Sequence, residues 1–89
     1  MTARLVYEVE LTKRASKDLD SLNRAQPELF EKVAAKIQSL RDDSKAGKPL
    51  VGPLKGKWSL RVGEYRIIYE IGKTEIIVLT VNHRREVYR

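Results

Sequence analysis

The sequence predicts an α+β fold in which a helical hairpin packs on one face of a small, twisted, mainly antiparallel sheet. Three observations predict it. Apolar and polar side chains alternate with a period of two near the N-terminus and in the second half of the chain, apolar residues recur at helical spacing in two segments between them, and very short links join the later strands. The element order is therefore β-α-α-β-β-β, and 89 residues suffice for a single domain over residues 1–89.

The first strand and the first helix follow one another directly. Alternating apolar residues predict a half-buried strand over Leu5–Leu11. Thr12 is a suitable N-cap for a helix over Lys13–Leu22, because its hydroxyl can accept a hydrogen bond from a free backbone N–H of the first turn. The apolar stripe of this helix consists of Ala15, Leu19 and Leu22.

A second helix is predicted after a short break at Asn23–Gln26. Pro27 suits the first helical position, and Glu28 lies near the positive end of the helix dipole. The apolar stripe of this helix consists of Phe30, Val33, Ala34, Ile37 and Leu40. Two short consecutive helices of this kind favour an antiparallel hairpin.

The segment Lys45–Pro53 is rich in Gly, Pro and Lys, which predicts a basic, irregular and mobile loop. Three strands are predicted after it, over Leu54–Val62, Tyr65–Ile71 and Glu75–Val81. Short turns at Gly63-Glu64 and Gly72-Lys73 favour hairpins between them. Because Glu75–Val81 is apolar on both faces, this strand is expected in the middle of the sheet.

The first of these three strands has one apolar face and one basic face. Trp58, Leu60 and Val62 alternate with Lys57, Ser59 and Arg61. In the next strand, the alternation places Arg66 on the other face of the sheet from Tyr65 and Tyr69. We interpret Trp58, Tyr65 and Tyr69 as core residues, so the arginines are expected on the solvent side of the sheet.

Charge is distributed unevenly along the chain. Lys and Arg minus Asp and Glu gives 8 − 8 = 0 over residues 1–44 and 10 − 4 = +6 over residues 45–89, so the positive charge lies on the predicted sheet. A basic surface on a rigid sheet indicates a polyanion as partner. The chain has no Cys and one His, so we expect neither metal nor cofactor, and the lack of a signal or membrane segment favours the cytoplasm.

Two stretches resemble the RelE/ParE superfamily of toxins, and the second resembles its RelE branch. They read Arg-Val-Gly-Glu-Tyr-Arg-Ile-Ile-Tyr at residues 61–69 and His-Arg-Arg-Glu-Val-Tyr at residues 83–88. The resemblance implies a toxin of a type II toxin–antitoxin system. Such a toxin is a metal-independent endoribonuclease that cleaves mRNA in the A site of the 30S ribosomal subunit through 2′-hydroxyl attack, and a cognate antitoxin silences it. ParE-type relatives instead inhibit DNA gyrase.

The resemblance also assigns roles to individual residues. It places a basic-strand cation at Arg61, the phosphate-clamping arginine at Arg66, the arginine near the leaving group at Arg84 and a base-stacking aromatic at Tyr88. The best-known pattern has two lysines in the basic strand, where this chain has Ser59 and Arg61. Since the pKa of arginine is above about 12, Arg61 is expected to act through its charge, which leaves His83 and then Lys57 as candidate acid or base.

Further basic residues are expected to bind RNA: Lys45, Lys48, Lys55, Lys57, Arg85 and Arg89. Each assignment has a structural alternative, such as a solvated charge cluster, a pairing of Arg66 with Glu64 or Glu70, or packing of Tyr88 at the C-terminus. Two other functions stay open at this point. One is gyrase inhibition without catalysis, and the other is a catalytically inactive relative that binds RNA or an antitoxin.

Overall fold

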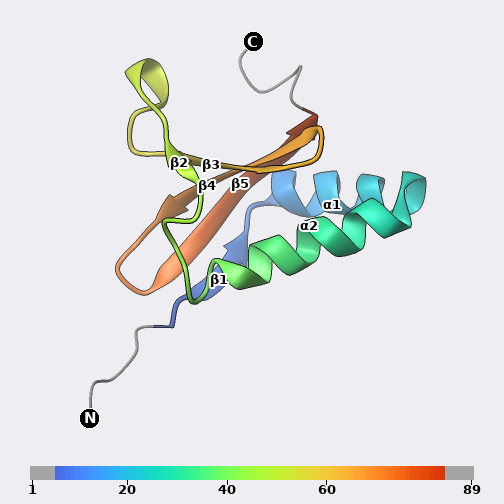
Figure 1. Cartoon of the computed structure of the whole chain (residues 1–89), viewed down its shortest axis with the longest axis horizontal. Coiled ribbons are helices and arrows are strands. Elements are labelled where there is room, and N and C mark those ends of the chain that lie inside the picture. Colours follow the sequence, from blue (N-terminus) through green and yellow to red (C-terminus); the bar gives the residue numbers. More distant parts are fainter. Residues whose placement is uncertain (1–5, 84–89) are drawn as a thin grey trace.

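A computed structural model describes residues 6–83 of the chain. The helices are α1 (Lys13–Ala25) and α2 (Pro27–Ser39), and the strands are β1 (Glu8–Leu11), β2 (Lys48–Pro49), β3 (Trp58–Val62), β4 (Tyr65–Ile71) and β5 (Glu75–His83). The described strands form one sheet in the order β1-β5-β4-β3-β2, and both helices lie against one of its faces (Figure 1). β1 runs parallel to β5 and the other neighbours are antiparallel, which confirms the predicted fold class.

The helical hairpin forms largely as predicted. The Thr12 hydroxyl caps α1 by accepting a hydrogen bond from the backbone N–H of Ala15 at 3.1 Å. The predicted break at Asn23–Gln26 is too long, because α1 continues to Ala25 and only Gln26 separates the helices. Pro27 explains this boundary, since a residue that precedes proline is disfavoured in the α conformation. Neither helix is long and apolar enough to cross a membrane.

The predicted irregular loop contains more structure than expected. Lys48–Pro49 pairs with β3 as the edge strand β2, and a short 3₁₀ turn follows at Gly52–Leu54. Proline is tolerated at a sheet edge, where a backbone N–H is not needed for pairing on both sides. The predicted start of the next strand at Leu54 is therefore wrong, and β3 begins at Trp58.

The core lies between the helices and the sheet. The predicted stripe of α1 is buried, and from α2 the side chains of Val33 and Ile37, followed by Leu40, meet the sheet. The largest fully buried side chains come from both layers: Tyr69, Leu40, Ile67, Ile76, Val33 and Val78. β5 is an interior strand as predicted, although β4 occupies the centre of the described sheet.

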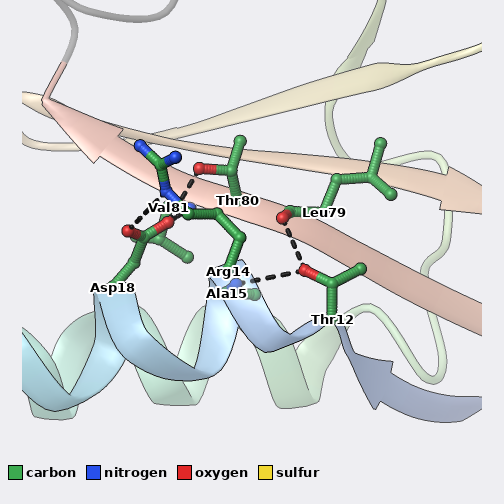
Figure 2. A network of polar contacts seen from close by, with 7 residues as sticks. All are labelled: Thr12, Arg14, Ala15, Asp18, Leu79, Thr80 and Val81. Carbon is green, nitrogen blue, oxygen red and sulfur yellow. Dashed lines mark hydrogen bonds and ion pairs between the residues drawn. The ribbon is translucent and has the colours of Figure 1, made fainter.

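A polar seam joins α1 to β5, whose pairing with β1 ends at Leu11 and Val78. Beyond that point the backbone N–H of Thr12 donates to the Val78 carbonyl at 3.1 Å, and its hydroxyl donates to the Leu79 carbonyl at 2.7 Å. Six residues later, Asp18 Oδ2 accepts from the Val81 N–H at 2.9 Å and the Thr80 hydroxyl at 2.7 Å (Figure 2). The start of α1 thus satisfies the strand edge that β1 leaves uncovered.

We expect Asp18→Ala to lower the free energy of unfolding by about 1–3 kcal/mol, because it removes the acceptor of the Val81 N–H. Arg14→Ala is the matched control. It removes only an i,i+4 pair to Asp18 whose arginine is 66% exposed, a contact worth less than about 0.5 kcal/mol. Urea unfolding measures both, and equal effects of the two substitutions would contradict the role of the seam.

Candidate nucleic-acid interface

The two faces of the sheet differ in character. On the helix side, Val62 pairs with Tyr65, Leu60 with Ile67 and Trp58 with Tyr69, and all six belong to the core or pack against it. Directly paired residues lie on the same face. The other face, here called the open face, carries Ser59, Arg61, Arg66, Ile68, Glu70 and Asn82. The predicted separation of an apolar and a basic face is confirmed for β3.

Arg61 and Arg66 lie directly opposite each other in the β3–β4 register, and Arg66 lies opposite Asn82 of β5. Arg61 is exposed and its Nε donates to the Gly63 carbonyl at 3.1 Å, whereas Arg66 is half-buried. Like charges directly opposite one another destabilise a sheet. An anion bound across the two guanidinium groups would relieve this repulsion, so the pair is suited to a phosphate.

A groove of about 450 Å³ lies beside the arginine pair, and we call it the β2–β3 groove. Its described lining consists of Ala46, Gly47, Lys48, Pro49, Leu50, Ser59, Leu60, Arg61 and Arg66. This lining contains three cationic side chains and no Asp or Glu among the residues that the structure describes. The described lining of the groove is therefore suited to a polyanion backbone.

Tyr69 holds the rim of the groove in place from the core side. Its ring is fully buried and stacks on Trp58, with centroids 6.3 Å apart. Its hydroxyl donates to the Ser44 carbonyl at 2.8 Å and accepts from the Gly47 N–H at 3.1 Å. Gly47 must lack a side chain, because a Cβ there would lie 2.6 Å from the Ser59 carbonyl oxygen. Burial raises the pKa of Tyr69.

Ser59 lies in the lining of the groove and is only 6% exposed. Its hydroxyl is buried and has no hydrogen-bond partner among residues 6–83. The sequence interpretation gave Ser59 no role in the site. The strand alternation in the sequence already places Ser59 on the face of Arg61, but a buried hydroxyl without a partner is visible only in the structure.

The predicted RNA-binding lysines occupy different positions. Lys45, Lys48 and Lys55 are exposed, and of these Lys48 reaches the groove. Lys57 is partly buried and forms an ion pair with Glu70, with Nζ 3.7 Å from Oε2. The predicted residues Arg84, Arg85, Tyr88 and Arg89 lie outside the described residues.

The structure does not bring His83 together with Arg61 and Arg66. His83 pairs in register with Tyr65 and meets its ring edge to face, with centroids 5.6 Å apart, so its side chain lies on the helix side. There it lines a separate cavity of about 240 Å³ together with Arg14, Asp18 and Ser21 of α1. Within residues 6–83, no group of three or more His, Cys, Asp or Glu residues is arranged to hold a metal ion.

Comparison with known proteins identifies a family. The family model described as the ParE toxin of type II toxin–antitoxin systems matches residues 9–88. The chain is 36% identical over 87 residues to the toxin RelG of Mycobacterium tuberculosis, covering 93% of this chain and 97% of RelG. It is 32% identical over 91 residues to the toxin RelE of the same organism, and the match covers 93% of this chain and 87% of RelE.

A solved structure agrees with these matches. The crystal structure of the toxin–antitoxin complex RelBE2 from Mycobacterium tuberculosis contains a chain with a TM-score of 0.78 and 32% identity. The match covers 89% of this chain and 99% of that one. The helical hairpin and mixed sheet described above are therefore the fold of a known toxin.

Tyr69→Phe is expected to reduce stability by about 1–3 kcal/mol at pH 8, because it leaves the Ser44 carbonyl and the Gly47 N–H without their partner. The raised pKa of Tyr69 predicts a second difference in alkali. In the wild type, the stability linked to the neutral phenol is complete below about pH 10 and is lost as the pH rises through the higher folded pKa. The free energy of unfolding, measured from pH 8 to 11, should fall less steeply for the variant than for the wild type. Parallel curves would contradict this assignment.

Binding of a single-stranded RNA should weaken with salt, and the slope of log affinity against log salt should become shallower by about 0.7 for each phosphate contact removed. We expect this change for Arg61→Ala and for Lys48→Ala, which both remove a cation from the groove. The matched control is Lys73→Ala, which removes an exposed lysine from the turn between β4 and β5. Fluorescence anisotropy measures the slopes, and an equal change in the control would exclude the groove as the specific contact.

Proposed function

The chain belongs to the RelE/ParE superfamily of type II toxin–antitoxin toxins, and from this premise we propose that it is a ribosome-dependent endoribonuclease that cleaves mRNA in the ribosomal A site. The observation that carries the proposal is the Arg61–Arg66 pair on the open face, next to a groove without acidic lining among its described residues. The similarity to two toxins, named RelG and RelE, supports the same branch of the superfamily.

The proposed reaction needs no metal. The ribose 2′-oxygen attacks the adjacent phosphorus, its proton leaves, the bond from phosphorus to the 5′-oxygen breaks, and that oxygen takes up a proton. The products are a 2′,3′-cyclic phosphate and a 5′-hydroxyl. The protein must favour loss of the first proton, stabilise the crowded phosphorane and help the leaving group.

Arg61 and Arg66 are proposed to stabilise the phosphorane by charge, since fixed cations on a rigid sheet need no reorganisation when negative charge develops. Arg84 near the leaving oxygen and Tyr88 stacking on a base complete the set that the resemblance implies. A proton acceptor is harder to place. The His83 ring lies on the other face and Lys57 is paired with Glu70, so we propose that much of the rate enhancement comes from the ribosome, which orients the mRNA backbone for attack.

A cognate antitoxin is the proposed protein partner, because the related RelBE2 chain was solved in a toxin–antitoxin complex. An acidic segment that covers the open face would neutralise Lys48, Arg61 and Arg66 and thereby block RNA. Since mRNA and ribosomes are the proposed targets, the cytoplasm is the proposed place of action.

Gyrase inhibition is the second candidate, because the matching family model carries the ParE description. A gyrase inhibitor acts by binding, so its toxicity would not depend on a phosphate-binding arginine pair. This difference separates the two candidates and also a catalytically inactive relative.

The test is primer extension on a translated reporter mRNA after brief induction. Wild type and the control Lys36→Ala, Lys73→Ala are expected to arrest growth and to cut the message in phase with codons. Arg61→Ala, Arg66→Ala should reduce cleavage by about 100-fold or more, because removal of single transition-state donors already has effects of this order. Thermal unfolding of the purified variants checks that they are folded.

The other outcomes assign the alternatives. Growth arrest with intact message would replace the nuclease by the gyrase inhibitor. Intact message without arrest would indicate the inactive binding relative. Cleavage of ribosome-free RNA at the same rate would contradict the dependence on the ribosome.

A further inference from the structure

The buried hydroxyl of Ser59 is the least explained polar group of the open face. It has no hydrogen-bond partner among the described residues, although backbone or side-chain partners satisfy the buried hydroxyls of Tyr69 and Thr80. A buried polar group without a partner costs stability, so a protein that keeps one usually has a use for it. Ser59 lies in the lining of the β2–β3 groove, together with Lys48, Arg61 and Arg66.

We propose that the Ser59 hydroxyl is a phosphate-binding group, which donates a hydrogen bond to a phosphate oxygen held by Arg61 and Lys48. This inference rests on the proposed function for its source of phosphate, the RNA backbone. It deepens that proposal by adding a neutral donor to the site and by placing one phosphate in the β2–β3 groove.

The strand register supports the proposal. Lys48 of β2 lies directly opposite Ser59 of β3, and Arg61 follows two residues along the same face. Directly opposed residues of an antiparallel pair have Cβ atoms about 5 Å apart, and next neighbours along a strand face are about 7 Å apart. The register therefore makes Lys48, Ser59 and Arg61 neighbours on one face of the sheet, and all three side chains can donate hydrogen bonds.

The chemistry of these donors selects the ligand. Hydroxyl, ammonium and guanidinium groups, with no carboxylate in the described lining of the groove, match a tetrahedral oxyanion with several acceptor oxygens. The groove, at about 450 Å³, has room for more than a phosphate alone, which fits a phosphate that is part of a nucleotide chain. The Ser59 hydroxyl has almost no exposed surface, so a group beside it must move when the phosphate enters. The exposed side chain of Lys48, which lies opposite Ser59 in the register, is the candidate.

A titration of the ribosome-free protein tests the proposal. Inorganic phosphate and adenosine 3′-monophosphate are each added to ¹⁵N-labelled protein, and backbone amide shifts are followed by NMR. We expect shifts at Ser59, Lys48 and Arg61 for both, and none for adenosine, which lacks phosphate. Tighter binding of adenosine 3′-monophosphate than of inorganic phosphate would indicate a nucleic-acid backbone as the source of the phosphate. Equal binding of the two would indicate free phosphate as the source.

Ser59→Ala is the decisive variant. It should bind both phosphates about tenfold more weakly, the loss expected for one hydrogen bond to a charged group. It should also raise the Tm by several degrees, because the unpartnered hydroxyl is gone from a buried site. A serine kept for structure alone would give a lower Tm and unchanged affinity, and this result would overturn the proposal.

Controls separate this inference from the proposed function. Ser16→Ala removes an exposed hydroxyl on α1 and should change neither affinity nor Tm. Shifts confined to other parts of the chain, or equal shifts with adenosine, would also overturn the proposal. The titration contains no ribosomes, so it is independent of the cleavage assay. If phosphate binding depends on Ser59 but the protein leaves mRNA intact, the nuclease proposal is rejected and the phosphate site is retained. If the protein cleaves mRNA but Ser59→Ala binds phosphate as well as the wild type, the phosphate site is rejected and the nuclease proposal is retained.

Discussion

The fold depends on how the second half of β5 is completed at its outer edge. β1 has four residues and β5 has nine, so the N-terminal strand pairs with less than half of its neighbour. Backbone groups left unpaired inside a protein are costly. Thr12 and Asp18 supply the missing partners from α1, which fixes the helix against the sheet at two points (Figure 2). The cap of the helix and the edge of the sheet are therefore one polar system.

This attachment determines which face of the sheet is free. With α1 held at β5 and α2 turned back by Pro27, both helices cover the same face, and neither helix covers the opposite one (Figure 1). Tyr69 then links the two sides. Its ring is part of the core, and its hydroxyl reaches the loop before β2, so core packing determines where Lys48 lies beside Ser59.

Residues with a strong local signal could be predicted from the sequence. Thr12, the stripe of α1 and the two faces of β3 follow from capping chemistry and from regular periods. β2 could not be predicted, because two residues that include a proline carry no periodicity and pair only where Tyr69 and Gly47 hold the loop. The face of His83 could not be predicted either. A bulge opposite Ile68 and Tyr69 adds one residue to β5 and reverses its alternation, so counting from Val78 places His83 on the wrong side.

Polar groups on the two faces of the sheet differ in their hydrogen bonding, and this difference supports a function for the open face. Toward α1 and the core, Asp18 and Tyr69 each have hydrogen-bond partners at 2.7–3.1 Å. On the open face, two arginines oppose each other and Ser59 buries a hydroxyl without a partner among the described residues. A buried hydroxyl without a partner does not stabilise the isolated chain. The unpartnered Ser59 hydroxyl, next to Lys48 and Arg61 in the strand register, therefore supports the proposal that the open face binds an anion.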